Sequence, residues 1–423
     1  MPIATTLPAR NVTLRFPPST STDSRDLRED DGEDEVEETY QLLELPPEIL
    51  KQVEGLKGDH DIFPLTIKGR PSDDATLCTP QTTFLLRTVG ISNSLLVCRT
   101  PFSSFASSSS SAVTTTSGSA SSSTLEVRDV CHQILECVPV APNLERIRTV
   151  LRDSAWQGLG SNAVALGKRK RGDGKRKGKE GKRWTRAMLG SVVQASEGEL
   201  ERGLRERCVV EVDGRMLLLP PALLKELLTI LLSLLTIHST TSATTCPTAP
   251  IIESLEEDHD LPPPLTREVL NLFGVVEGEQ WEADVKGIVR EVGRGLLVAL
   301  KGDKKRDDFL EEWKGEVGES WAEVVDLTLL EGEYLLNPAP PSAFNSASPV
   351  LTHFPSSSLS LQPAIRFADL FLTRPRWRPD EMAPFLKGLT RESDNKERDK
   401  LVAKFVRVVK EKEGVWWYPR RTA

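Results

Sequence analysis

Residues 184–219 read WTRAMLGSVVQASEGELERGLRERCVVEVDGRMLLL. Thr185 is placed to cap a first helix, and Ser196 with Glu199 forms a capping-box pattern that starts a second helix. The Asp-Gly pair at 213–214 lies between two apolar runs and predicts a hairpin, because a type I′ turn requires positive φ at both central residues. Two helices followed by a hairpin predict a winged helix.

The same order follows twice more, with weaker signals. Apolar periodicity predicts further helices at 267–273, 281–300, 306–314, 321–327, 367–372, 380–389 and 395–412, and extended segments at 333–336 and 415–418. We therefore predict three tandem winged-helix modules, at 184–245, 250–336 and 363–423, with a Pro/Ser-rich linker at 337–362.

The first hundred residues have the pattern of short strands separated by turn residues such as Ser92-Asn93. Strands are predicted at 11–16, 40–45, 62–67, 75–79, 82–89 and 94–99. Because six short strands enclose only a small core, we predict an antiparallel β-barrel-like module over 1–138 that strands of a partner chain complete. Its inserts 17–39 and 103–124 are predicted to be disordered, since they can bury little apolar surface.

A helical pair at 127–138 and 143–152 is predicted to close this module. Residues 139–183 then contain the second of these helices and a basic linker. The predicted fold class is α+β: an N-terminal antiparallel β-barrel-like module followed by tandem winged-helix domains.

Composition excludes several function classes. The chain of 423 residues is 38% hydrophobic and 27% charged, as in globular proteins, and its net charge of -8 is distributed in blocks. The six cysteines and five histidines show no zinc-ligand or catalytic spacing, and no nucleophile elbow or dinucleotide fingerprint occurs. We predict that the chain is not an enzyme, binds no metal and needs no cofactor.

No signal peptide is expected, so the protein should be intracellular. The apolar run 217–237 contains Pro220, Pro221, Lys225 and Glu226, which leaves too short an unbroken stretch to cross a membrane. We interpret it as a core helix and expect no membrane partner.

A basic cluster lies between the two halves of the chain. It resembles a bipartite nuclear import signal, which predicts a nuclear location; direct phosphate contact and a solvating tether are the alternatives. A phosphate loop is excluded because Asp173 stands where the phosphate-binding lysine is required. The predicted import residues are Lys168, Arg169, Lys170, Arg171, Lys175, Arg176 and Lys177.

The last predicted helix carries cations at intervals of 4, 4 and 3 residues, within about 80° of arc, while Leu401, Phe405 and Val408 form an apolar face. This is the geometry of a helix that contacts a DNA groove, and an ordinary solvated face is the alternative. From Arg366 to Ala423 there are fifteen basic and nine acidic residues, which favours phosphate contact with little base specificity. The predicted DNA-binding residues are Lys396, Lys400, Lys404, Arg407, Arg374, Arg376, Arg378, Arg420 and Arg421.

Several short motifs, taken in order, resemble the Dcc family, named for defective in sister chromatid cohesion. They are LLEL at 42–45, LTIKG at 65–69, ATLCT at 75–79, SNSLL at 92–96, QASE at 194–197, RW at 376–377 and EMAPFL at 381–386. The resemblance covers most of the chain except the two inserts, and residues 262–336 match only loosely.

The resemblance implies a non-catalytic subunit of an alternative replication factor C complex, a clamp loader that acts in DNA replication, the cell cycle and sister chromatid cohesion. It implies that the barrel is shared with the large Ctf-type subunit and a small third subunit, and that the assembly docks on DNA polymerase epsilon. The winged helices are implied to touch DNA and to assist loading or unloading of the PCNA clamp.

A second function class remains open on the residues alone. A free-standing winged-helix transcription or chromatin factor would also explain the basic linker. It should fold and bind DNA alone, whereas a clamp-loader subunit should require partner strands.

Overall fold

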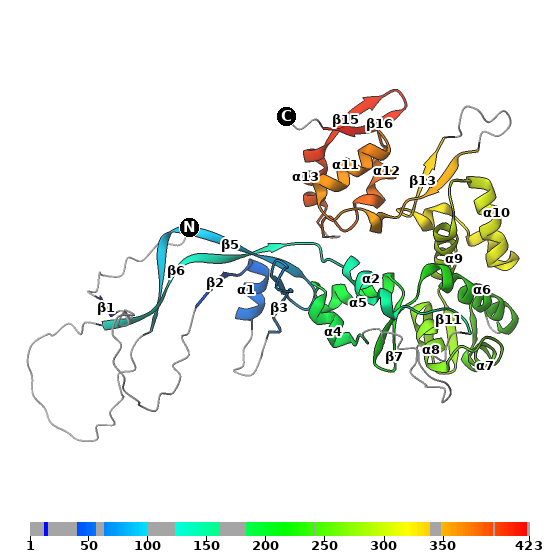
Figure 1. Cartoon of the computed structure of the whole chain (residues 1–423), viewed down its shortest axis with the longest axis horizontal. Helices are drawn as coiled ribbons and strands as arrows, with labels where there is room; N and C mark the ends of the chain where they lie inside the picture. Colours follow the sequence, from blue (N-terminus) through cyan, green and yellow to red (C-terminus); the bar gives the residue numbers. More distant parts are fainter. Residues whose placement is uncertain are drawn as a thin grey trace, which may run out of the picture. The chain divides into compact units, whose positions relative to one another are not determined.

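The computed structural model describes most of the chain as a mixed α+β structure (Figure 1). The described residues are 12–15, 40–55, 63–99, 123–160, 183–239, 242–338, 348–391 and 394–420. Insert 17–39, residues 103–122 of the second insert and all seven predicted import residues lie outside these ranges. Two compact units are formed, one by 1–63 and 85–138 and the other by 64–84 and 139–423.

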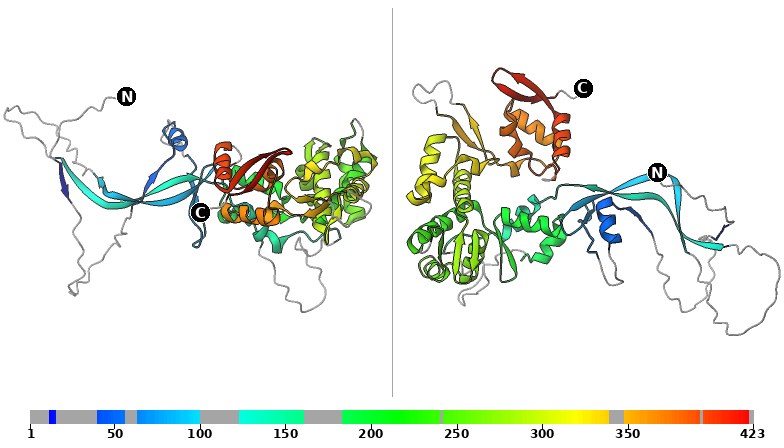
Figure 2. Two further views of the ribbon diagram at one scale, coloured as in Figure 1. Left: turned by 90° about the horizontal axis from the view of Figure 1, so that it is seen from above. Right: turned by 180° about the vertical axis from the view of Figure 1, so that it is seen from behind.

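Two long strands, β5 (Thr83–Arg99) and β6 (Ser123–Pro139), dominate the first unit and run side by side (Figures 1 and 2). The short strands β1 (Val12–Arg15) and β2 (Leu42–Glu44) both pair with β6 in parallel. The sheet is therefore mixed, not antiparallel as predicted. Among the described residues, no sheet closes into a barrel.

Two local predictions in this region are wrong. Residues 127–138, predicted as a helix, lie within β6, and the Ser92-Asn93 pair, predicted as a turn, lies within the continuous strand β5. Pairing along two 17-residue strands outweighs the local signals here. The helix α1 (Pro47–Glu54) was not predicted, although Pro at its first position is a start signal.

The second unit begins with a short hairpin, β3 (Thr66–Lys68) and β4 (Thr76–Cys78). After it, one order of elements recurs four times in the described part of the unit: a helix, a short extended segment, two further helical segments and a hairpin. In each repeat the extended segment pairs with the second hairpin strand. The sequence predicted three such modules.

The first repeat confirms the local signals of residues 184–219. Thr185 accepts from the Met188 amide, and Ser196 with Glu199 forms the capping box. Asp213 and Gly214 have φ of 51° and 73° in the hairpin turn. Its elements are α2 (Glu145–Leu151), η1 (Arg152–Ser154), α4 (Arg186–Val192), α5 (Glu197–Glu206), β7 (Val209–Val212) and β8 (Arg215–Leu218), and its extended segment is Trp184, whose carbonyl accepts from Met216.

The second repeat contains a three-stranded sheet in the order β10, β11, β9. The sequence did not predict its hairpin. Residues 281–283 were predicted as part of a helix, but they form β11. Its elements are α6 (Pro221–His238), β9 (Thr245–Pro247), α7 (Thr248–His259), α8 (Pro263–Leu272), β10 (Gly274–Glu277) and β11 (Gln280–Ala283).

The third repeat has strand order β12, β14, β13, and its third helical segment is replaced by two 3-10 turns. The segment 250–336, predicted as one module, thus holds most of the second repeat and most of the third. The elements are α9 (Val285–Ala299), β12 (Lys304–Lys305), α10 (Arg306–Val317), η2 (Glu319–Val324), η3 (Leu327–Leu330), β13 (Tyr334–Asn337) and β14 (Val350–His353).

The fourth repeat ends the described chain. Trp377 is its extended segment and bridges to Trp417. Its elements are α11 (Pro363–Thr373), α12 (Pro379–Met382), η5 (Ala383–Leu386), α13 (Asn395–Phe405), β15 (Val406–Glu411) and β16 (Gly414–Pro419), preceded by the turn η4 (Ser356–Ser358).

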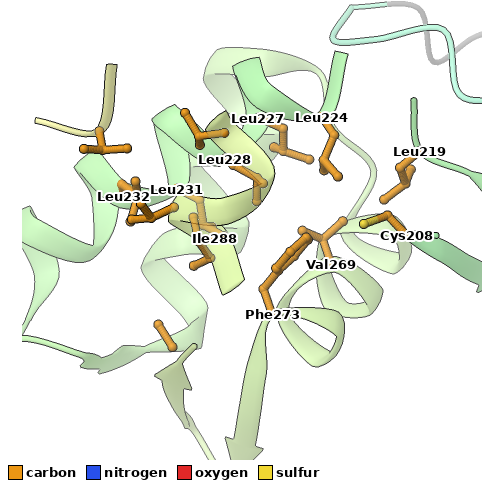
Figure 3. Close-up of a cluster of buried hydrophobic side chains, with 14 of the residues drawn as sticks. Cys208, Leu219, Leu224, Leu227, Leu228, Leu231, Leu232, Val269, Phe273 and Ile288 are labelled. Carbon is orange, nitrogen blue, oxygen red and sulfur yellow. The ribbon is translucent and has the colours of Figure 1, made fainter. Parts of the chain in front are cut away.

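One continuous core joins the second and third repeats and reaches Cys208 and Leu219 of the first (Figure 3). The helix α6 packs along α9, and seven of its eight leucines are buried, with Leu224 and Leu231 fully enclosed. By length and composition α6 could cross a membrane. Its burial within this core agrees with the interpretation of 217–237 as a core helix.

Candidate nucleic-acid interface

The helix α13 carries three of the predicted DNA-binding lysines. The Asp394 carboxylate accepts from the Glu397 amide at 2.9 Å and caps its start. The helix ends at Phe405, whereas the sequence predicted a helix to residue 412. Residues 406–411 form β15, since their β-branched valines pair with the aromatic strand β16.

Because the helix is shorter, the predicted series of four cations on one helix face is interrupted. Arg407 and Val408 lie on a strand and not on the helix, so the fourth cation does not continue the helical series. Leu401 and Phe405 pack on the core of the repeat as predicted, and the Phe405 ring stacks on Phe367 with centroids 5.0 Å apart. Val408 does not, because it is 55% exposed.

Lys396, Lys400 and Lys404 are all exposed on α13. In the part of the chain that the structure describes, none of the three lies within ion-pair distance of a carboxylate, although Glu397 and Asp399 are on the same helix. Lys404 extends over the Phe405 ring, with 5.5 Å from Nζ to the centroid. These cations are available to an anionic partner.

Arg374, predicted to bind DNA, is instead committed to internal contacts. Its guanidinium donates to the Leu336 carbonyl at 2.5 Å and to Asn337 Oδ1 at 3.0 Å, and it pairs with Glu381 at 3.3 Å. Burial lowers the pKa of Arg374. It joins the third repeat to the fourth.

Three other predicted arginines lie against aromatic rings. Arg376 and Arg378 both lie over the Trp416 ring, at 4.1 and 5.3 Å from its centroid, and Arg407 lies 5.7 Å from that of Tyr418. A hydrogen bond with the Tyr418 hydroxyl, and then the Glu411 carboxylate, raise the pKa of Arg376. These contacts bring residues 376, 378 and 407 to one hairpin.

Arg420 donates from its guanidinium to the Ala403 carbonyl at 2.6 Å, which satisfies a carbonyl in the last turn of α13. Arg421 lies outside the described residues.

Trp416 and Tyr418 were not predicted as part of the interface. Their alternation along β16 was available in the sequence, and so was the Arg-Trp-Arg series at 376–378. The pairing that aligns these segments is a long-range contact, which no local pattern specifies.

No group of three His, Cys, Asp or Glu side chains that could hold a metal ion occurs within the described ranges. The chemistry of this surface is that of charged and aromatic contacts.

A protein-family model matches most of the chain. No curated protein matches the chain. The family model for Sister chromatid cohesion protein Dcc1 matches residues 40–386, from just before β2 to the end of η5. The family acts in sister chromatid cohesion, as a non-catalytic subunit of a multi-protein complex, which implies a nuclear role. Since the match spans most of the sequence, the chain belongs to the Dcc1 family of sister chromatid cohesion proteins.

Proposed function

We propose that the chain is a subunit of an alternative replication factor C clamp loader that acts in DNA replication and cohesion and assists loading or unloading of PCNA. It binds partner subunits through its N-terminal sheet and DNA through its last repeat. Membership of a family of cohesion-complex subunits supports the assembly role. The exposed lysines of α13 are the observation that supports DNA contact.

The first unit has features that favour completion by partner strands. Its sheet is open among the described residues, and Leu43, Leu95 and Leu96 are between 36% and 44% exposed. Open strand edges with apolar side chains are sites where another chain can add strands. The occupants we propose are the C-terminal tail of the large Ctf-type subunit and the small third subunit, with DNA polymerase epsilon docking on the assembly.

We infer that each repeat is a winged helix. The order helix, strand, helix, helix, hairpin, with the first strand paired to the last, supports this assignment. In such a module the helix before the hairpin is the one that enters a DNA groove. In the fourth repeat that helix is α13.

The third helical segments of the other repeats are poorly suited to the same task. The helix α5 has four glutamates against two arginines, and α8 has one arginine, Arg267, beside Glu268. The corresponding turns of the third repeat carry acids and no cation. DNA contact is therefore assigned to α13, with an ordinary solvated face as the alternative.

Affinity purification of the tagged full chain from its own cells, followed by mass spectrometry, tests the assembly. We expect a large clamp-loader subunit, a small third subunit and the polymerase in stoichiometric amounts. Recovery of the chain alone, with strong sequence preference in DNA binding, would favour the free-standing transcription or chromatin factor.

Nuclear entry is proposed to depend on the basic cluster at 168–177. Alanine substitution of Lys168–Arg171 and Lys175–Lys177 should shift the protein to the cytoplasm in cells lacking the large subunit, which could otherwise carry it in. An unchanged nuclear signal there would leave the segment as a tether.

A further inference from the structure

The fourth repeat has a second charged surface, on its hairpin. Strand β16 lies between β15 and the segment at Trp377. Side chains alternate between the two faces of a sheet, and Trp377, Trp417 and Val406 occupy the inner face against the core. The outer face therefore receives Arg376, Arg378, Trp416, Tyr418, Arg407, Val409 and Glu411.

Close contacts link these outer side chains into one row. Trp416 lies beneath both Arg376 and Arg378. Arg376 pairs with Glu411 at 3.0 Å, and the other Glu411 oxygen accepts from the Tyr418 hydroxyl at 2.6 Å. Tyr418 in turn lies beside Arg407, so the row runs from Arg378 to Arg407.

The row leaves a net positive charge. Three guanidinium groups share the face with Glu411, and Glu413 in the hairpin turn is the second carboxylate that acts on Arg376. An arginine held over a ring keeps its planar N–H groups directed outward while its rotamer freedom is already reduced. The entropy lost when such a side chain binds a phosphate is correspondingly smaller.

The Trp416 indole contacts Arg376 and Arg378 and makes no hydrogen bond in the described structure. Its Nε1 donor is covered yet has no acceptor in the described structure. The two guanidinium groups are the contacts that the ring does make.

We propose that this outer hairpin face is a second DNA-backbone contact, in which Arg376, Arg378 and Arg407 bind phosphates and Trp416 and Tyr418 are positioning residues. The inference rests on the proposed DNA-binding function and adds a surface separate from the α13 lysines. Because the contacts are to phosphates, binding through this face is insensitive to base sequence.

The test uses the full chain and a fluorescent duplex oligonucleotide of mixed sequence, titrated by anisotropy over a range of salt concentrations. The double variant Arg376→Ala/Arg378→Ala should lower the slope of log affinity against log salt by up to about 1.8, since each lost phosphate contact contributes about 0.9. The substitution Val415→Ala, at an exposed valine on the opposite face, is the matched control and should leave both quantities unchanged.

If Trp416 only positions the arginines, Trp416→Ala should change DNA binding in a different way from the arginine variant. All charges remain, so the salt slope should hold while affinity falls by roughly threefold to fivefold. Trp416→Phe keeps an aromatic face and should recover most of that loss. Thermal unfolding of each variant separates this effect from misfolding.

The outcomes distinguish the inference from the function on which it rests. If the wild-type chain binds the duplex and the double arginine variant keeps its slope and affinity, the hairpin contact is overturned and the α13 contact stands. If Trp416→Phe is as weak as a folded Trp416→Ala, the positioning role of the ring is overturned. If the wild-type chain shows no DNA binding, both the function and this surface fall together.

Discussion

The first and fourth repeats contain the same order of elements but use the helix before the hairpin in opposite ways. In the first repeat, α5 buries Leu200, Leu204 and even Glu199, whose carboxylate accepts from Thr83 of β5 and from Ser196. In the fourth repeat, α13 has no fully buried residue. The helix α5 is therefore used for packing within the chain, whereas α13 keeps a face that a partner can contact.

The sequence explains this difference. Gly203 of α5 lies so close to Leu144 that an added Cβ would meet its Cδ2 at 2.8 Å, so the absence of a side chain permits close helix packing. The helix α13 contains no glycine, and its three lysines are exposed. Truncating a leucine and removing the N-cap in each helix measures this difference.

The largest contrast should come from truncating one leucine in each helix. Leu200→Ala should cost about 2 to 5 kcal/mol in free energy of unfolding, because it leaves a cavity in a closed core. Leu401→Ala should cost about 1 kcal/mol, since that side chain is only half-buried. Urea denaturation followed by tryptophan fluorescence measures both, and equal losses would show that α13 is packed as tightly as α5.

Removing the N-cap should also cost more free energy of unfolding in α5 than in α13. Ser196→Ala should cost about 2 kcal/mol, because the buried hydroxyl both accepts from the Glu199 amide and donates to its carboxylate. Asp394→Ala, at the exposed cap of α13, should cost about 0.5 to 1 kcal/mol. The same denaturation experiment measures the pair, and a larger loss at Asp394 would reverse the comparison.

An ion pair beside the first repeat should make its stability sensitive to acid. Arg146 binds the Asp73 carboxylate through two hydrogen bonds of 2.6 and 2.8 Å and, with the Arg70 amide, lowers the Asp73 pKa from 3.8 to about 2. A lowered native pKa stabilises the fold above the unfolded pKa, and the gain is lost as pH falls from about 4 to about 2.

Asp73→Asn should therefore be less stable than the wild type at neutral pH, and the difference should shrink over that acid window. Thermal midpoints measured against pH give the comparison. Glu256→Gln, at an exposed acid with no ion pair in the described structure, is the control. A constant gap between Asp73→Asn and wild type from neutral pH to below pH 2 would contradict the account.

Sequence patterns predicted the features that local chemistry determines. The caps at Thr185 and Ser196 and the turn at 213–214 need only neighbouring residues, and all three are confirmed. The fold class α+β is confirmed as well, and the family resemblance is confirmed by the match over 40–386.

The errors occur where pairing with another strand decides the local structure. Residues 127–138 have apolar side chains at Val127, Val130, Ile134 and Val138, a helical spacing, yet pair as a strand with β5. At the end of α13, the spacing of the lysines happens to continue to Arg407, although that residue pairs with Tyr418 in the hairpin. In the first case the partner strand lies across the insert 103–124, and in the second it follows after only two residues. In neither case does periodicity within one segment reveal the pairing.

If α13 of the fourth repeat contacts DNA and the other repeats do not, the salt dependence of DNA binding by the full chain should change when Lys396, Lys400 and Lys404 are changed to alanine. The matched variant changes Lys286, Lys301 and Lys314, three exposed lysines of the third repeat without ion pairs in the described structure. The slope of log affinity against log salt concentration should fall by up to about 2.7 in the α13 variant and stay unchanged in the matched variant. An unchanged slope in the α13 variant, or an equal loss in both, would contradict this assignment of DNA contact.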